Sequence, residues 1–249
     1  NPAKAWTEIA KGDRPATKAY YRFIEKPDSS PVTTSAILRP HREQTIRRMQ
    51  AQQTVLCIQD GTDLNYTNLA TCEGLHSIGS NQTGARSKGL HLHSTLAVTT
   101  AGLPLGVLRA DFPRPHPKPP KTRDKTGRLR DVRSSAIPIE KKKTFAWIEA
   151  LRDLGTVSEQ MPGTRLLSVM DREADFYELF DEWRRNLRVG LLVRVKHNRK
   201  TATGTKLFEA VASTPVRGRY DIRVPRQSAR PKRSKQKARP ARKERTAKV

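Results

Sequence analysis

The chain has 249 residues and carries 49 Lys and Arg against 24 Asp and Glu, which gives a net charge of +25. This balance argues against an ordinary acidic metabolic enzyme. Hydrophobic residues make up 35% of the chain, which is low but sufficient at this length for one core with basic appendages. No stretch has the roughly 18 uncharged apolar residues that a membrane span needs, and the first residues do not form a signal-peptide pattern. We therefore expect a cytoplasmic protein without a membrane partner.

Cys57 and Cys72 are too few for a disulfide framework and fit a reducing compartment.

The predicted elements, in chain order, alternate between strands and helices. Spaced apolar residues predict two short helices near the start, and continuous apolar runs predict buried strands, with Cys57 in the core. A break at Ala101 and Gly102 predicts a β-hairpin, and Gly155 is expected to end the helix that begins near Phe145. This order predicts an α/β fold with a mixed sheet. The expected helices are 6–23, 36–52, 145–154 and 176–187, and the expected strands are 53–60, 90–99, 103–112, 165–170 and 189–195.

The excess positive charge is concentrated in two segments. Residues 217–249 hold 14 Lys or Arg and two acids, and residues 109–143 hold 12 basic residues, four acids and six prolines. Residues 144–183 instead carry nine acids and three basic residues. The basic segments are typical of a phosphate-binding surface, with an ordinary solvated surface as the alternative. The acidic segment indicates a cation site or, alternatively, the polar face of a helix.

Two aspartates follow apolar strands. Asp60 comes after VLCIQ, and Asp171 comes directly after LLSVM. In an open α/β sheet, ligands gather at the carboxyl ends of the strands. Two carboxylates brought together there need a cation between them, and hard oxygen ligands select Mg²⁺ or Mn²⁺. The sequence therefore predicts a divalent metal site at Asp60 and Asp171.

Each of these residues also has a structural interpretation. Asp171 could cap the following helix, and Asp60 could be a turn residue before Gly61. Asp63 is expected to stabilise a local turn, and Glu173 and Asp175 are expected to face solvent in the first helical turn. His91 and His93 share one face of a predicted strand, but no third nitrogen or thiolate ligand lies close by in sequence, so a zinc site is not the favoured interpretation.

The segments around these aspartates resemble the RNase H-like DDE transposases of bacterial insertion sequences, in the group of the transposon-five transposase. The resemblance is carried by VLCIQDGTDLNYT (55–67), GLHLHSTL (89–96), LLSVMDREADFYELFDEW (166–183), GLLVRVKHNRK (190–200), ARPARKE (238–244) and, in the N-terminal region, YYRFIEKP (20–27). The most specific piece is DREAD after a buried strand, combined with the aspartate of IQDGT.

The resemblance implies an RNase H-like mixed sheet flanked by helices. Residues 1–52 would form a partial helical DNA-binding region, residues 53–200 the first part of the catalytic core, and residues 201–249 the start of a basic β-rich insertion that is partly disordered. The implied activity is cut-and-paste transposition in the bacterial nucleoid: cleavage at transposon ends and strand transfer into target DNA.

The resemblance also assigns roles to individual residues and partners. Asp60 and Asp171 would be the first two members of the metal-binding Asp-Asp-Glu triad, with Mg²⁺ as cofactor and Mn²⁺ as a substitute. Arg194, Lys196 and Lys200 would lie near DNA phosphates. The implied partner is double-stranded DNA, both transposon ends and target, with a homodimer in the full-length complex.

The third carboxylate of the family is absent. It belongs to a Y-x2-R-x3-E-x6-K signature, and this spacing does not occur here. The acids after Arg199 are Glu209, Asp221 and Glu244, and none of them is expected to complete the triad. The sequence is therefore expected to be a transposase lacking its C-terminal part, with slow or absent catalysis on its own.

Two other functions remain open. The chain could be a non-catalytic remnant that binds transposon ends or inhibits transposition, which would explain an intact basic surface beside an incomplete triad. It could also be a basic RNA-binding or ribosomal-type protein, but that function leaves both strand-end aspartates unexplained.

Overall fold

The computed structural model describes residues 6–27, 29–69, 71–80, 86–114, 120–123, 126–185, 188–229, 231 and 239–248. The chain divides into two compact units, residues 1–196 and residues 197–249. No helix in the described residues is long and apolar enough to cross a membrane.

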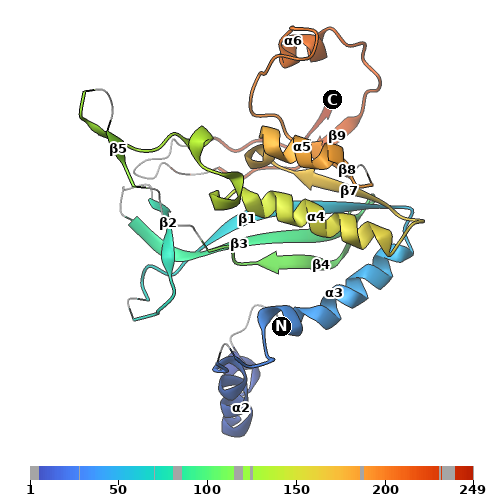
Figure 1. Cartoon of the computed structure of the whole chain (residues 1–249). Coiled ribbons are helices and arrows are strands. Elements are labelled where there is room, and N and C mark those ends of the chain that lie inside the picture. The colour runs from blue at the N-terminus through green and yellow to red at the C-terminus, as the bar shows by residue number, and fades with distance from the viewer. Residues whose placement is uncertain are drawn as a thin grey trace. The chain divides into compact units, whose positions relative to one another are not determined.

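The first unit is built on a mixed six-stranded sheet (Figure 1). The strands follow the order β2-β3-β1-β7-β8, and β4 pairs with the same edge of β3 that β2 uses. Strand β3 runs antiparallel to β1, β2 and β4, whereas β7 runs parallel to both β1 and β8. The α/β mixed sheet expected from the sequence is therefore confirmed. The strands are β1 (Thr54–Asn65), β2 (His76–Ser80), β3 (Arg86–Thr99), β4 (Pro104–Asp111), β7 (Arg165–Met170) and β8 (Gly190–Val193).

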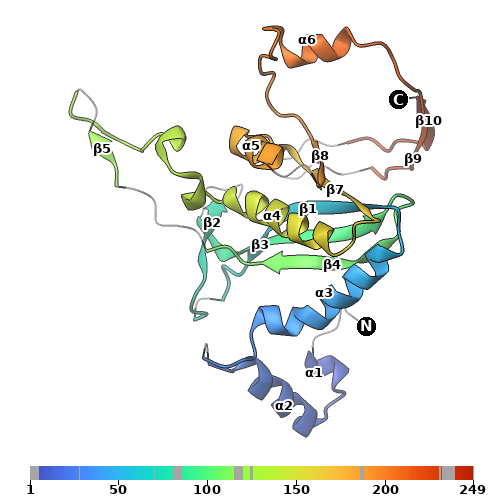
Figure 2. The same cartoon turned by 45° about the vertical axis from the view of Figure 1, so that its right-hand side comes forward.

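Alternation along β1 defines the two faces of the sheet. Val55, Cys57 and Gln59 are buried, whereas Ile58 is 38% exposed. Helix α4 (Phe145–Glu159) crosses the face that carries the buried set, as Figure 2 shows. Burial raises the pKa of the Cys57 thiol to about 12, so this residue is an inert part of the core, as expected.

Helix α4 continues past the glycine that was expected to end it. Gly155 is buried within the helix, and Val157 beyond it is fully buried in the core. The expectation was wrong because the buried apolar stripe outweighs the weak helix propensity of one glycine, which costs about 1 kcal/mol.

Two further helices pack beside α4. Helix α3 (Thr34–Gln50) buries Ile46 and Met49, and its Arg42 forms an ion pair of 2.8 Å with Asp153 of α4. Helix α5 (Tyr177–Arg185) buries Leu179. Arg152 of α4 donates two hydrogen bonds, of 2.9 and 2.7 Å, to Glu182 of α5, and these bonds lower the pKa of Glu182.

The remaining elements of the first unit are short or exposed. Helix α2 begins after Asp13, whose carboxylate accepts a hydrogen bond from the Ala16 backbone N–H, and it has no buried residue. These elements are α1 (Trp6–Ile9), α2 (Arg14–Ile24), β5 (Thr122–Arg123), β6 (Leu129–Arg130) and the 3₁₀ turns η1 (Ser134–Ala136), η2 (Ile139–Lys141) and η3 (Arg172–Ala174).

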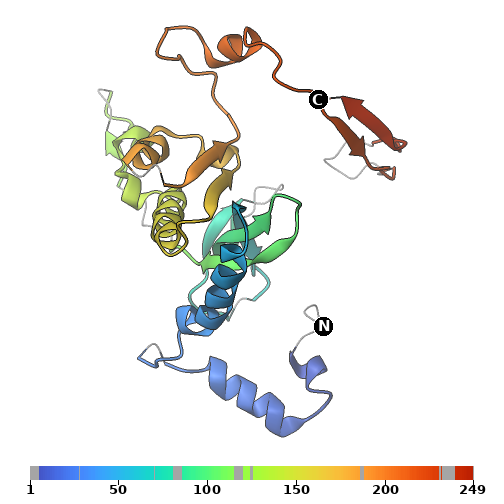
Figure 3. The ribbon, with the colours of Figure 1, turned by 90° about the vertical axis from the view of Figure 1, so that its right-hand side faces the viewer.

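The second unit contains a short helix and a two-stranded antiparallel ribbon (Figure 3). Its elements are α6 (Leu207–Ala212), β9 (Asp221–Val224) and β10 (Arg245–Lys248). Arg223 of β9 forms an ion pair of 2.6 Å with Glu244, which directly precedes β10. The described residues of this unit include no buried residue, which agrees with its low content of apolar side chains.

Candidate functional site

Asp60 lies in β1, and Asp171 directly follows the neighbouring parallel strand β7. The pairing of β1 with β7 ends at Ile58 and Val169, and each aspartate lies two residues further along the chain. The two residues therefore lie at the same end of two adjacent strands, which are about 4.8 Å apart where they pair. Because side chains alternate along a strand, both aspartates point to the face on which Ile58 and Val169 lie, opposite to α4.

The backbone around each aspartate differs from the simplest expectation. Asp60 neither ends its strand nor forms a turn, because β1 continues to Asn65 and pairs Asp60 with Ser94 of β3. Strand β3 still pairs with β1 at this point, although the pairing of β1 with β7 has ended at Ile58. Asp171 does cap the following turn, since its Oδ1 accepts a hydrogen bond of 2.7 Å from the Glu173 N–H. The N-cap interpretation is therefore confirmed.

Both carboxylates are exposed and retain an oxygen that could bind a metal. Oδ1 of Asp60 accepts a hydrogen bond of 2.9 Å from the Gly61 N–H, as Oδ1 of Asp171 does from Glu173. Within the described part of the chain, neither Oδ2 atom has a hydrogen-bond or ion-pair partner. Two such oxygens suit a hard divalent cation such as Mg²⁺. They form only part of a ligand set, since the described residues contain no group of three or more His, Cys, Asp or Glu side chains placed to hold a metal.

The three residues predicted to contact DNA are divided between the two units. Arg194 and Lys196 follow β8 in the first unit, and the Arg194 N–H donates a hydrogen bond of 3.0 Å to the carbonyl of Met170, the residue before Asp171. Both side chains are exposed. Lys200 belongs to the second unit, where it forms an isolated β-bridge with Lys206.

Asp175 links the turn after Asp171 to the segment that carries these basic residues. It was expected to face solvent, but it is only 5% exposed, and its Oδ2 accepts a hydrogen bond of 2.6 Å from the Lys196 N–H. Glu173 is exposed as expected. The expectation for Asp175 was wrong because its partner is a backbone amide from a segment 21 residues away, which helical periodicity does not reveal.

We expect Asp175→Ala to destabilise the first unit by about 1.5–3 kcal/mol, because a charge-assisted hydrogen bond is lost and the Lys196 amide loses its acceptor. Asp175→Asn should cost less, since the amide oxygen still accepts a hydrogen bond. Urea unfolding of both variants measures the difference. Equal losses for alanine and asparagine would show that the hydrogen bond contributes little.

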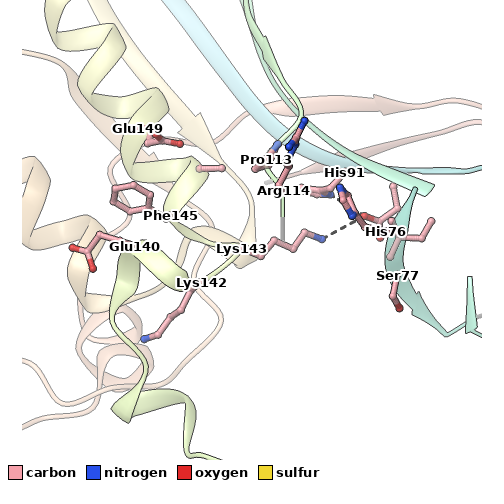
Figure 4. A pocket seen from close by; sticks show the side chains of 13 residues that line it. His76, Ser77, His91, Pro113, Arg114, Glu140, Lys142, Lys143, Phe145 and Glu149 are labelled. Atoms are coloured by element: carbon pink, nitrogen blue, oxygen red, sulfur yellow. Dashed lines mark hydrogen bonds and ion pairs between the residues drawn. The ribbon is translucent and has the colours of Figure 1, made fainter. Parts of the chain in front are cut away.

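A second group of polar residues lines a pocket of about 440 Å³ between the start of α4 and the ends of β1, β2 and β3 (Figure 4). Asp63 was expected in a turn, but it lies in β1, and its Oδ1 is 2.8 Å from His91 Nδ1 and 3.5 Å from Lys143 Nζ. Partial burial alone would raise the pKa of Asp63, but the His91 hydrogen bond and the positive charge of Lys143 outweigh it and lower that pKa. The apolar wall includes Phe145.

This pocket does not combine His91 and His93 into a metal site. His91 contacts Asp63, whereas His93 is 1% exposed and packs edge-on against Trp147 of α4, with 4.7 Å between the ring centroids. No cluster of metal ligands forms around the pair in the part of the chain that the structure describes.

A row of buried polar side chains continues from His93 beneath α4. The pairing of β1 with β3 sets Gln59 opposite Thr95 and Gly61 opposite His93. Gln59 donates a hydrogen bond of 2.9 Å to Ser168 Oγ of β7, so it connects the two strands that carry the aspartates. The sequence analysis missed this role, although Gln59 has the same strand parity as the buried Val55 and Cys57.

Burial beneath α4 makes His93 sensitive to acid. Desolvation, with the nearby charges of His91, Arg109 and Lys143, lowers its pKa from 6.5 to about 4 in the folded state. Above pH 6.5 the imidazole is neutral in both the folded and unfolded states. As the pH falls from 6.5 to 4, the unfolded state binds the proton first, and we expect stability to drop by up to about 3 kcal/mol.

Urea unfolding at a series of pH values between 7 and 4 measures this dependence. His93→Gln removes the titrating group and keeps a polar side chain of similar size, so the variant should lose most of the slope between pH 6.5 and 4. An unchanged slope in the variant would assign the acid sensitivity to other groups.

No protein-family model matches this chain. The assignment of a function therefore depends on the residues themselves and on where the fold places them. The clearest indication of a site is the pair Asp60 and Asp171, because these residues are more than 100 positions apart in the sequence and yet belong to the same end of two neighbouring strands.

Proposed function

We propose that this chain is a metal-dependent DNA transposase with an RNase H-like core, related to the transposon-five group, and that Asp60 and Asp171 are its metal-binding carboxylates. The observation that supports the proposal is the β1–β7 register, whose last pair, Ile58 with Val169, comes two residues before Asp60 and two residues before Asp171. Two exposed carboxylates at neighbouring positions repel each other and so favour a bound cation.

The fold is compatible with this proposal. A mixed sheet flanked by helices is what the resemblance implies, and α4 leaves the aspartate-bearing face uncovered by its own side chains. A divalent ion held there would activate the attacking oxygen and stabilise the leaving oxygen of a phosphodiester. The chain's own part is to hold the two carboxylates at fixed spacing, through the Asp171 cap and the Gln59–Ser168 hydrogen bond beneath them.

Charge supports DNA as the substrate. The net charge of +25 supplies long-range attraction to a polyanion. Arg194 and Lys196 follow β8, which pairs with β7, the strand that ends just before Asp171. Within this proposal they contact phosphates near the scissile bond, Lys200 contacts DNA from the second unit, and the protein acts at the bacterial nucleoid. The basic surface and the carboxylate pair together favour a metal-dependent enzyme over a basic RNA-binding or ribosomal-type protein, because basic charge alone would not require the aspartates.

The test begins with selection of bound sequences from a random duplex DNA library. The selected duplex is then incubated with the chain and Mg²⁺, Mn²⁺ or Ca²⁺, and nicks are mapped on both strands. Because the third carboxylate of the family is absent, we expect at most slow nicking, at one position with Mg²⁺ or Mn²⁺, and its loss in the Asp60→Asn, Asp171→Asn double variant. Nicking that persists in the double variant would refute the site.

One observation favours a second function, that of a non-catalytic protein that occupies transposon ends or traps the active enzyme in mixed oligomers. The described residues contain no third acidic or histidine side chain grouped with Asp60 and Asp171. In the same assay, tight binding to the selected duplex without nicking under any of the three metals supports this function. Metal-dependent nicking by the chain excludes it.

A further inference from the structure

The connection between β4 and α4 is far longer than the fold requires. β4 ends at Asp111 and α4 begins at Phe145, so the link is roughly 30 residues long, whereas strand-to-helix loops in compact domains usually have about 2–6 residues. Loops of this length within a domain are usually functional. The sequence analysis identified this segment as basic, but the residues proposed above for the reaction do not include it.

Within this connection the described residues 121–123 and 126–133 contain a short hairpin, and we call the segment 121–133 the basic hairpin (labelled β5 in Figures 1 and 2). Strands β5 and β6 pair Thr122 with Arg130 and Arg123 with Leu129, and Arg123 Nη1 donates a hydrogen bond of 2.8 Å to the Gly127 carbonyl. Every described residue from 121 to 131 is exposed. A two-stranded hairpin without a buried face is marginally stable by itself, so packing does not explain its presence.

The composition of the basic hairpin is strongly one-sided. It contains six Lys or Arg and two acids. One of the acids, Asp131, forms an ion pair of 3.7 Å with Lys121. The excess positive charge is exposed, since Arg123, Arg128 and Arg130 all lie at the surface.

The hairpin is also hollowed on one side. A groove of about 1050 Å³ lies along the hairpin and the segment that leads to η1, and its lining includes Lys121, Arg128, Arg130 and Arg133 together with one acid, Asp131. Arginine guanidinium groups bind phosphate oxygens through paired N–H donors, so a concave surface lined by them fits a phosphate backbone better than a flat one does. A two-stranded ribbon is also narrow enough to enter a groove of duplex DNA.

We propose that the basic hairpin is a second DNA-binding element, which binds phosphates of duplex DNA in addition to the contacts of Arg194 and Lys196. This inference rests on the proposed DNA-binding function and names a further part of the same interface. Because its contacts are to phosphates, which every DNA sequence presents, its contribution is independent of DNA sequence.

The test compares two triple variants with the same change in charge. Arg123→Gln, Arg128→Gln, Arg130→Gln neutralises the hairpin, and Arg165→Gln, Arg184→Gln, Arg188→Gln is the matched control on exposed arginines near the start of β7 and the end of α5. Circular dichroism establishes that both variants are folded. The dissociation constant for a selected and for a random 30-base-pair duplex is then measured between 50 and 200 mM salt.

We expect the hairpin variant to bind both duplexes more weakly and with a smaller salt dependence. If each arginine neutralises one phosphate, the slope of log Kd against log salt falls by about 2.7 in the variant. Over the fourfold rise in salt, the DNA affinity of the unmodified chain should then fall about 40-fold more than that of the variant. The control should change the slope little.

Two results would overturn the inference. They are equal slopes for the hairpin variant and the unmodified chain, and equal effects of the hairpin and control variants. If the unmodified chain does not bind duplex DNA at all, the proposed function itself fails, and that result is distinct from failure of the hairpin alone.

Discussion

Asp171→Asn should remove divalent-ion binding while leaving the fold intact. Asparagine caps a helical turn as well as aspartate does, so the hydrogen bond to the Glu173 N–H is kept and only the charge is lost. In the unmodified chain, Mn²⁺ at 100 times its dissociation constant should stabilise the folded state by about 2.7 kcal/mol. In Asp171→Asn and in Asp60→Asn we expect this stabilisation to fall to near zero.

The same variants should behave differently without metal. Two like charges at neighbouring positions of a sheet are destabilising, so removing one of them should leave stability unchanged or raise it slightly. Mg²⁺-dependent nicking, where the chain shows it, should fall at least about 100-fold in either variant, since even loss of an outer-shell partner of a metal can cost that much.

Thermal unfolding with and without Mn²⁺ measures the stabilisation by the metal, and the mapped nicking assay measures the loss of Mg²⁺-dependent nicking. Glu173→Gln is the matched control, because it removes an exposed acid two residues from Asp171 and should retain the Mn²⁺ response. If Asp60→Asn and Asp171→Asn respond to Mn²⁺ as the unmodified chain does, the two residues are not metal ligands.

Trp147→Ala should cause the largest loss of stability among single substitutions in α4. The indole is 3% exposed, belongs to the main core and packs edge-on against His93 of β3. Truncation of a buried tryptophan leaves a cavity, and the expected cost is about 3–5 kcal/mol. Because the indole also shields His93, the pKa of that histidine should rise in the variant as water reaches the ring.

Urea unfolding at pH 7 measures the loss, and NMR titration of the imidazole follows the pKa. Tyr177→Ala is a suitable control, since this aromatic side chain on the neighbouring helix α5 is 74% exposed and should cost less than about 0.5 kcal/mol. A loss below about 1 kcal/mol for Trp147→Ala would mean that α4 does not pack on the sheet as described.

The candidate site was predictable from the sequence to different degrees. Asp60 and Asp171 were detectable because each follows an apolar strand, and strand periodicity is a strong local signal. Asp63 and Asp175 were misinterpreted, and the contact of His91 with Asp63 was not predicted. Asp63 and His91 are 28 residues apart, and Asp175 accepts its hydrogen bond from an amide 21 residues away, so no local pattern indicates either contact.

The sequence by itself determined the α/β class, the order of β1, β3, β4, α4, β7, α5 and β8, the buried Cys57 and the concentration of positive charge, because these depend on local periodicity and composition. Only the tertiary structure decided that Ile58 pairs with Val169, and therefore that Asp60 and Asp171 lie at the same end of two adjacent strands. It also decided that α4 continues through Gly155 and that β1 continues past Asp60. The physical reason is that strand register and helix length depend on burial and hydrogen bonding between segments far apart in the chain, and these contacts outweigh local propensity.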